Sequence, residues 1–467
     1  DDSDWYPHEA REDRFKNFVE ESPDWNVSRQ RYWGTPIPIW LPEEWSGDMD
    51  EAIIVGTREE LAERADQEVD TADIDLHRPT VDDITITEDG TTYERVPDVF
   101  DVWIDSSVAS WGTLDYPGNS EAFDRLWPAD LIMEAHDQTR GWFWSQLGMG
   151  TAALGEVPYS DVLMHGYANM PDGRGMSKSK NITVEPGEVI EEYGADPMRL
   201  FLLSRNPQGE DMRFSWDETQ NMQRDLNILW NVFRFPLPYM RMDEFDPEAV
   251  DLADCDLEAV DEWLLSRLQT TVEEMTAAWD GYRQDEALDV LLEFLVEDVS
   301  RFYIQVVRER MWAEADSESK TAAYATFHHV LTKTVTLFAP FAPLVAEQIY
   351  GTLTGESGHP TVHMEDWPEF DDEWYAPQLE ADIETVRAVE EAGANARQQA
   401  GRKLRWPVTR VVVAADADGV ADSVDRQRAL LRERLNAREI ELIEATEDWD
   451  ELAYGARADM SVLGPTF

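Results

Sequence analysis

The sequence predicts an α/β fold built on a parallel sheet, followed by a helical bundle and then by a small α/β piece. Three observations predict this order. Apolar strand-like runs alternate with helical segments between residues 101 and 205, which is typical of parallel sheets. Long apolar stripes at helical spacing replace them after Trp216. Beyond Glu365 a polar helix, a strand and a further helix follow.

The first 97 residues divide into two predicted stretches. In residues 28–40, SRQRYWGTPIPIW, the closely spaced Gly34, Pro36 and Pro38 interrupt any regular helix and predict an ordered loop or an edge strand. We assign residues 1–40 to the first segment of the chain. Residues 41–97 are strongly acidic, with short β-like pieces around turn signals. They predict a small inserted β module.

Residues 98–215 are predicted to contain a βαβ unit. Strands are expected over residues 130–135 and 161–168, with a helix opening near Asp137 between them, and this span meets the roughly 30 residues that such a unit needs. A further helix is expected to begin at Pro186 and to end before Gly194, because proline favours the first helical position and glycine the position just past the end.

Residues 216–375 are predicted to form the helical bundle. Helices are expected over residues 285–312 and 321–353, the second interrupted by two prolines. Residues 376–467 are predicted to be an α/β region, with a helix near residues 379–400, a strand over 408–415 and a helix near 424–434.

The charge of the chain is extreme. A total of 98 Asp and Glu residues against 39 Lys and Arg gives a formal net charge of −59, yet the 42% hydrophobic content argues against disorder. Only six of the basic residues are lysines, and a diffuse acidic surface of this kind is typical of adaptation to molar salt. There the Debye length falls to about 3 Å. The net charge therefore does not exclude a nucleic-acid partner.

The cysteine content and hydropathy bound the environment. A single cysteine, Cys255, excludes an intrachain disulfide and predicts a reducing, cytoplasmic location. No apolar run approaches the roughly 20 residues of a membrane span, so no membrane partner is expected. The chain opens with Asp1 and has no signal-peptide pattern, which predicts a segment of a longer protein.

The loop DGRGMSKSKN, residues 172–181, follows the second predicted strand. Two of the six lysines, Lys178 and Lys180, lie in it, and mobile ammonium groups at the carboxyl end of a parallel strand suit phosphates. By composition alone a solvated surface loop is equally plausible. As a string it resembles the KMSKS signature of class I aminoacyl-tRNA synthetases, here occupied by Gly175, Met176, Ser177, Lys178 and Ser179.

This resemblance implies roles for the loop. All five residues would bind ATP, and Lys178 would be catalytic, stabilising charge as pyrophosphate leaves. Gly175 stands where the family has its first lysine. Arg174 and Lys180 are the candidates to replace that cation.

The string EAHDQTRGWFW, residues 134–144, spans the end of the first predicted strand and the start of its helix. Glu134, Asp137 and Gln138 therefore converge on the crevice where open α/β sheets bind ligands. Alternatively, Asp137 is only a helix N-cap and Glu134 only a partner of Arg140.

As a whole, that string resembles the E-G-x-D-Q-x-R-G-W segment of isoleucyl-tRNA synthetases, with Ala135 for the usual glycine. The resemblance implies that Glu134, Asp137 and Gln138 bind the adenylate. Trp142, together with Trp103 from the preceding DVWIDSSVASW, would wall the amino-acid pocket. Taken without the family, Trp103 is better explained as ordinary core.

Further resemblances cover the rest of the chain. Residues 24–40 resemble the return from the editing insertion into a Rossmann-like catalytic domain, and at least one of Arg29 and Arg31 is expected to pair with a neighbouring carboxylate. Residues 216–375 resemble the anticodon-binding bundle. A basic patch of Arg397, Arg402, Lys403, Arg405 and Arg410 either binds tRNA, with Arg402, Lys403 and Arg405 foremost, or offsets nearby acids.

Two family features are missing. The stretch matching the zinc-binding module of archaeal-type members, residues 41–97, holds no cysteine, so no structural zinc is expected there. No string resembling HIGH, the other ATP-binding signature of the class, occurs, and in the family that signature is expected near the amino end of the enzyme. The editing domain of the family would likewise lie upstream of this chain. The chain is therefore expected to be the carboxyl-side portion of the longer enzyme.

The resemblance implies an isoleucine-tRNA ligase that uses ATP with Mg²⁺, isoleucine and tRNA(Ile), with no resident metal in this segment, and that works as a cytoplasmic monomer. Two alternatives stay open. A valyl- or leucyl-tRNA synthetase would share much of this sequence. A catalytically silent tRNA-binding module would explain the missing HIGH string and Gly175.

Overall fold

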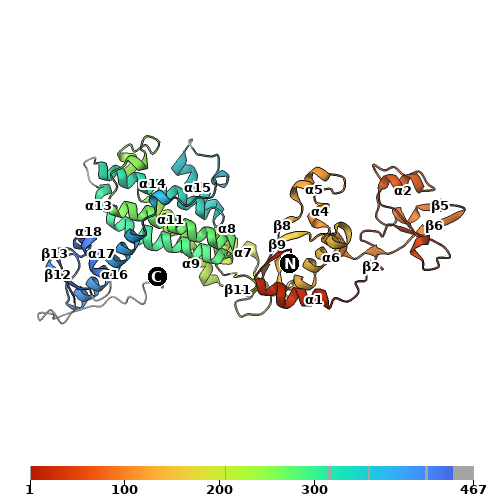
Figure 1. Ribbon diagram of the computed structural model, residues 1–467, viewed down its shortest axis with the longest axis horizontal. Coiled ribbons are helices and arrows are strands. Elements are labelled where there is room, and N and C mark those ends of the chain that lie inside the picture. The colour runs from red at the N-terminus through yellow and green to blue at the C-terminus, as the bar shows by residue number, and fades with distance from the viewer. Residues whose placement is uncertain (1, 206, 313–316, 356–357, 416–418, 445–467) are drawn as a thin grey trace. The chain divides into compact units, whose positions relative to one another are not determined.

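A computed structural model describes residues 2–205, 207–312, 317–355, 358–415 and 419–444 (Figure 1). The chain divides into two compact units. The first comprises residues 1–183 and 206–214, and the second comprises residues 184–205 and 215–467. Whether the five stretches predicted above fold as separate domains stays a prediction.

A parallel three-stranded sheet organises the first unit. Its strand order is β1 (Asp4–Tyr6), β9 (Tyr159–His165) and β8 (Ala129–Ala135). Helix α6 (Trp142–Leu154) connects β8 to β9, so the predicted βαβ unit and the α/β class are confirmed. Trp5, Phe143 and Val162 are buried in the core beneath this sheet and helix. The carboxyl ends of β8 and β9 lie side by side, since Ala135 pairs with His165.

A four-stranded antiparallel sheet forms the inserted β module. Its order is β4 (Ile53–Ile54), β3 (Ile39–Pro42), β6 (Thr91–Arg95) and β5 (Thr85–Glu88). Trp40 is almost fully buried and its indole N–H donates to the carbonyl of Ile84 at 2.8 Å. The buried guanidinium of Arg95 pairs with Asp82, and its Nε donates to Asp82 Oδ1 at 2.9 Å. An Arg–carboxylate pair thus holds the base of this module.

Short elements complete the first unit. Two further strand pairs are present: antiparallel β2 (Ser28–Arg29) with β7 (Val99–Phe100), and parallel β10 (Ala168–Asn169) with β11 (Met212–Arg213). The remaining α-helices are α1 (Lys16–Glu20), α2 (Arg58–Arg64), α3 (Val102–Ser107), α4 (Ala109–Gly112) and α5 (Ser120–Leu126).

The second unit begins as a helical bundle. Its core is formed by buried apolar side chains such as Leu264, Leu268, Phe294 and Phe338, which recur at helical spacing. The bundle helices are α7 (Pro186–Tyr193), α8 (Ala195–Ser204), α9 (Trp216–Arg234), α10 (Leu237–Met242), α11 (Ala259–Asp280), α12 (Gln284–Glu293), the π-helical η7 (Phe294–Tyr303), α13 (Ile304–Trp312), α14 (Glu318–Phe338) and α15 (Pro343–Thr354).

A small α/β piece follows the bundle. Helix α16 (Pro377–Gln399) leads into the parallel pair β12 (Val408–Ala414) and β13 (Ala437–Ile443), with α17 (Val420–Arg426) and α18 (Arg428–Arg434) between the two strands. The part of the predicted C-terminal region at residues 445–467 lies outside the described residues. No helix of the described chain has both the length and the apolar character needed to cross a membrane.

Candidate active site

The EAHDQ string lies at the carboxyl end of β8, where open parallel sheets bind ligands. Glu134 is exposed near the end of the strand, and Asp137 and Gln138 lie in the following 3₁₀ turn, His136–Arg140. The EAHDQ string therefore lies at the edge of the sheet, as the sequence predicts. That these residues and Lys178 of the signature loop bind the same nucleotide stays a prediction.

Gln138 joins the turn to helix α6. Its Oε1 accepts the backbone N–H of Trp142 at 2.9 Å, and its Nε2 donates to Asp137 Oδ2 at 2.9 Å. Gly141 makes this possible, because a Cβ at that position would lie 2.6 Å from Gln138 Oε1. The N-cap residue of α6 is Gly141, so Asp137 is not the N-cap of that helix. The side-chain amide of Gln138 therefore orients the carboxylate of Asp137 just past the end of β8.

The two candidate pocket tryptophans lie on either side of Gly141. A Cβ on Gly141 would be 3.4 Å from the ring of Trp103, and Trp142 follows directly in the chain. The indole N–H of Trp142 donates to the carbonyl of Ser106 at 2.9 Å, which ties α6 to α3. Trp103 is 38% exposed, so it is not ordinary core. The fold thus places the ring of Trp103 beside Gly141, the residue before Trp142.

Asp101 fixes the helix that carries Trp103. Its Oδ1 accepts the backbone N–H of Trp103 at 3.4 Å, and its Oδ2 accepts the indole N–H of Trp25 at 3.0 Å. Arg29 forms an ion pair with the same carboxylate. The expectation that one arginine of the SRQR string pairs with a nearby acid is therefore confirmed for Arg29, which acts beside the candidate pocket.

The signature loop presents its lysines to solvent. Lys178 and Lys180 lie in a short 3₁₀ turn and are exposed, and within the described part of the chain neither forms an ion pair. Arg174 instead pairs with Asp172 at 2.7 Å. The backbone N–H of Arg174 and then its guanidinium lower the pKa of Asp172. Of the two candidates to replace the missing cation, Lys180 is therefore the one without a carboxylate partner.

Three polar residues that the sequence did not indicate connect these two segments: His136, Tyr167 and Asp211. Asp211 Oδ1 accepts the backbone N–H of Tyr167 at 2.7 Å and lies 3.3 Å from Nε2 of His136. The Tyr167 N–H, followed by the side chains of His136 and Asn169, lowers the pKa of Asp211. Burial, followed by a hydrogen bond to Asp137, raises the pKa of Tyr167. Only folding brings position 211 to this edge.

The basic patch is smaller than expected. Arg402, Lys403 and Arg405 are exposed between α16 and β12. Arg397, in contrast, is buried and donates to backbone carbonyls, including that of Leu435 at 2.8 Å, so its inclusion in the surface patch is wrong. Arg410 pairs with Glu441 at 2.8 Å. The burial of Arg397 follows from its helix position, which faces the α/β piece.

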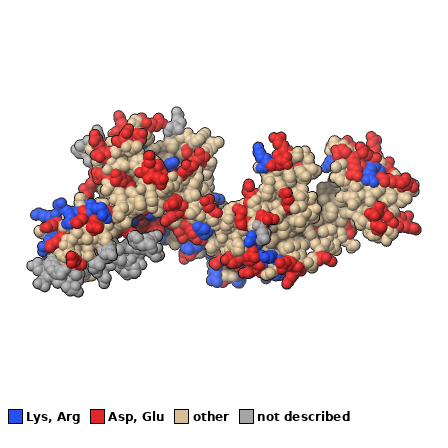
Figure 2. Space-filling model, viewed as in Figure 1, with Lys and Arg blue, Asp and Glu red and all other residues tan. Residues whose placement is uncertain are grey.

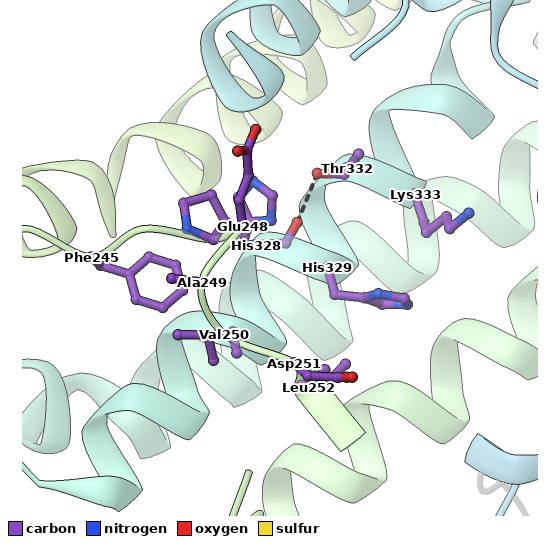
Figure 3. A pocket seen from close by; sticks show the side chains of 12 residues that line it. Phe245, Glu248, Ala249, Val250, Asp251, Leu252, His328, His329, Thr332 and Lys333 are labelled. Carbon is purple, nitrogen blue, oxygen red and sulfur yellow. Dashed lines mark hydrogen bonds between the residues drawn. The ribbon is translucent and has the colours of Figure 1, made fainter. Parts of the chain in front are cut away.

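A cavity of about 590 Å³ lies in the helical unit, against α14 (Figure 3). His328, His329 and Lys333 line it from the helix, and Glu248 and Asp251 line it from the preceding loop. Burial, together with the charges of Lys333 and His328, lowers the pKa of His329 to about 4. This histidine is therefore neutral at physiological pH. Across the described residues no cluster of three or more metal-binding side chains occurs.

Two family models match the chain. The family described as "tRNA synthetases class I (I, L, M and V)" matches residues 1–215, and the "Anticodon-binding domain of tRNA ligase" matches residues 261–413. The chain belongs to the class I tRNA synthetases. The part of this synthetase chain from α11 through α16 is thus its anticodon-binding domain, whereas α7 to α10 lie before the matched residues.

Curated relatives of this synthetase chain match it from end to end. It is 72% identical over 467 residues to the isoleucine–tRNA ligase of Natronomonas pharaonis, covering 100% of this chain and 44% of that protein. For the protein of the same name from Haloarcula marismortui the identity is 69%, with the same coverage. Against that of Methanosarcina barkeri it is 46%, covering 99% of this chain and 44% of the relative. The chain therefore spans less than half the length of these relatives.

Solved structures share the synthetase fold. The LeuRS chain of an Agrobacterium radiobacter LeuRS-tRNA-LeuAMS ternary complex superimposes with a TM-score of 0.56 at 21% identity, covering 79% of this chain and 46% of that chain. The Mycobacterium tuberculosis methionyl-tRNA synthetase in complex with methionyl-adenylate gives a TM-score of 0.52 at 21% identity, covering 74% of this chain and 58% of that chain. At this identity the likeness concerns the fold.

Proposed function

We propose that this chain is the carboxyl-side part of the catalytic domain, together with the anticodon-binding domain, of an isoleucine–tRNA ligase. The observation that carries the proposal is 72% identity over all 467 residues to a relative of that name. The site geometry supports it, because the EAHDQ turn, two tryptophans and the lysine loop all belong to the first unit. The whole enzyme would act in the cytoplasm as a monomer.

The first reaction would form the adenylate. The carboxylate of isoleucine attacks the α-phosphorus of ATP, a P–O bond forms, and the bond to the β-phosphate oxygen breaks to release pyrophosphate. The exposed ammonium of Lys178 is free to stabilise the negative charge on the leaving group. Gly175, Met176, Ser177 and Ser179 would hold the phosphates. Mg²⁺ would accompany ATP and supply further charge neutralisation.

The end of β8 would hold the other part of the adenylate. Glu134 and Asp137 offer carboxylate oxygens to hydroxyl and ammonium donors, and Gln138 holds Asp137 at 2.9 Å. Trp103 and Trp142 would wall the isoleucine side chain. Discrimination against valine by such a pocket rests on one methylene, which is worth only about 1–3 kcal/mol, a range for which the isoleucyl enzyme is the standard example.

The second reaction would transfer the isoleucyl group to tRNA(Ile). A ribose hydroxyl at the 3′ end attacks the acyl carbon, and AMP leaves. The helical unit would bind the anticodon region, and the exposed Arg402, Lys403 and Arg405 would contact phosphates. Molar salt screens the repulsion between tRNA and the acidic surface, so these local cations can act.

Amino-acid-dependent ATP–pyrophosphate exchange by the full-length protein tests the proposal. We expect the exchange with isoleucine to exceed that with valine or leucine. A larger value of kcat/KM for valine or leucine would make the protein a valyl- or leucyl-tRNA synthetase. If tRNA binds but no amino acid supports exchange, the protein is the silent binding module and the proposal is wrong.

A further inference from the structure

The carboxylate of Asp211 lies where the two motif segments of the candidate active site approach each other. It accepts the backbone N–H of Tyr167 at 2.7 Å and the side-chain amide of Asn169 at 3.4 Å, and His136 Nε2 is 3.3 Å away. His136 follows β8 directly, whereas Tyr167 and Asn169 lie between β9 and the signature loop. One side chain therefore contacts both segments.

The backbone holds Asp211 in this place. Strands β10 and β11 pair in parallel, with Met212 N donating to the Tyr167 carbonyl and Phe214 N donating to the Asn169 carbonyl, each at 2.9 Å. At Gly166 a Cβ would lie only 2.0 Å from the carbonyl oxygen of Glu210. The two chain segments are thus packed at backbone contact, which fixes the backbone of residue 211 beside Tyr167 and Asn169.

Asn169 passes this constraint on to the signature loop. It forms an isolated β-bridge with Gly175, the first residue of the signature, and Met170 N donates to the carbonyl of Arg174 at 2.8 Å. A second bridge closes the loop between Ser177 and Ile182. Residues 169–175 and 177–182 therefore form two consecutive tight turns; Asn169, which Asp211 binds, closes the first, and Lys178 lies in the second, which begins two residues after Gly175.

The other arm of the network reaches the strand-end turn. The ring of Tyr167 packs edge-on against His136, with centroids 4.5 Å apart, and the pKa of its hydroxyl is raised first by desolvation and then by Asp137. Asp137 is in turn held by Gln138. A change at Asp211 would therefore alter the position of both the candidate adenylate-binding turn and the start of the lysine loop.

We propose that Asp211 is a positioning residue: through Tyr167 and Asn169 it sets the orientation of the loop that carries Lys178 relative to the turn at Asp137. The catalytic part of this inference rests on the proposed function. The structural part, that Asp211 orders residues 170–182, does not. If Asp211 were only a surface carboxylate, neither the activity nor the order of residues 170–182 would depend on it.

The test uses the full-length protein with Asp211→Asn, which keeps the shape and removes the charge. Asp130→Asn, an exposed carboxylate in β8 of the same unit, is the matched control. We expect kcat for isoleucine-dependent ATP–pyrophosphate exchange to fall about tenfold with Asp211→Asn, while KM for isoleucine changes less than about twofold. Asp130→Asn should match the wild type in both.

A double-mutant cycle with Lys178→Ala decides whether Asp211 acts through the loop. If it does, Asp211→Asn costs less than about twofold in the Lys178→Ala background, because the group it positions is already gone. If the losses in kcat of the two single variants instead multiply in the double variant, the proposal is wrong. Asn169→Ala, which removes one donor to Asp211 and leaves that carboxylate in place, should reproduce part of the loss and serves if Asp211→Asn does not fold.

Hydrogen–deuterium exchange of the peptide spanning residues 170–182 tests the structural part without any activity. We expect at least about tenfold faster exchange in Asp211→Asn than in the wild type or Asp130→Asn. Equal exchange in all three proteins would contradict the proposal. If instead the wild type shows no isoleucine-dependent exchange of pyrophosphate but the peptide still loosens, the proposed function fails and the ordering role of Asp211 stands.

Discussion

Arg310 binds both carboxylate oxygens of Asp261 in the core of the helical unit, with Nη1–Oδ1 at 3.1 Å and Nη2–Oδ2 at 2.8 Å. The side chain of Asp261 is fully buried, and the hydroxyl of Tyr303 donates to its Oδ1 at 2.7 Å. A planar fork of donors is required here, which only arginine offers.

Arg310→Ala should destabilise the helical unit strongly. It leaves a buried carboxylate without its cation, so we expect the free energy of unfolding to fall by about 3–5 kcal/mol. Arg301→Ala is the matched control, because its pair with Glu297 lies on the surface of η7 and should cost at most about 0.5 kcal/mol. Urea unfolding at a fixed molar KCl concentration measures both. Equal losses would show that the Asp261 pair adds no special stability.

The stability of the helical unit should depend on pH through His329. Burial holds its pKa at about 4 in the folded chain, against about 6.5 when unfolded. Above pH 6.5 the histidine is neutral in both states, so its contribution is intact; between pH 6.5 and 4 the unfolded state gains the proton and stability falls, by about 3 kcal/mol at pH 4. The groups facing it are His328, Lys333 and Asp371.

His329→Gln separates this effect from the titration of carboxylates. The variant should be less stable at neutral pH but should lose less stability than the wild type between pH 6.5 and 4. His363→Gln, at an exposed position, should keep the wild-type slope. Parallel stability curves for wild type and His329→Gln would show that His329 does not titrate in this way.

The β module should depend on Asp82 and not on a metal. Asp82→Ala leaves the buried guanidinium of Arg95 without its carboxylate, and we expect the module to lose about 3 kcal/mol. Asp83→Ala, at an exposed neighbour, is the control. Hydrogen–deuterium exchange of the peptide covering residues 85–95 reports on the module. A zinc chelator should leave that exchange unchanged; faster exchange on chelation would reveal a structural metal.

Lys178→Ala should slow adenylate formation in the full-length protein by about 100-fold, since it removes a cation aimed at the leaving group. Binding of isoleucine should change little. Lys180→Ala should cost less, and Lys16→Ala, at an exposed position on α1, should cost nothing. Single-turnover measurements of adenylate formation distinguish these outcomes. An undiminished rate for Lys178→Ala would refute the catalytic role of this lysine.

The chain should need molar salt to stay folded. The acidic side chains gather over the surface of both units (Figure 2), and their mutual repulsion grows as screening weakens. Circular dichroism during stepwise removal of KCl should show loss of helix as the salt falls below molar levels. A spectrum that is unchanged in dilute buffer would rule out adaptation to high salt.

Much of the fold could be predicted because local patterns decide it. Pro186 and Gly194 bracket α7 as expected, and the helix predicted over residues 321–353 is divided into α14 and α15 around its prolines. The turn between β8 and α6 was harder to predict. A helix is expected to open near Asp137, but the 3₁₀ turn His136–Arg140 precedes α6, whose first backbone N–H, that of Trp142, donates to the side chain of Gln138.

The candidate site was predictable only in part. Its motif residues are contiguous strings, so they could be read directly from the chain. Partners distant in sequence could not: Asp211 lies 75 residues from His136, and Arg29 lies 72 from Asp101. The burial of Arg397 was equally invisible, because its carbonyl acceptors include Leu435, which only the packing of α18 against α16 brings near.

By itself, the sequence determined the α/β-then-helical order, the acidic surface and the strings that carry the candidate chemistry, since periodicity, charge and motifs are local properties of a chain. The tertiary structure decided which polar groups are neutralised and which stay available. Arg29, Arg95, Arg174 and Arg397 have partners, whereas Lys178 and Lys180 have no carboxylate partner within the described residues. The reason is physical: a charge is satisfied by its neighbours in space, and the sequence does not specify distances between residues far apart along it.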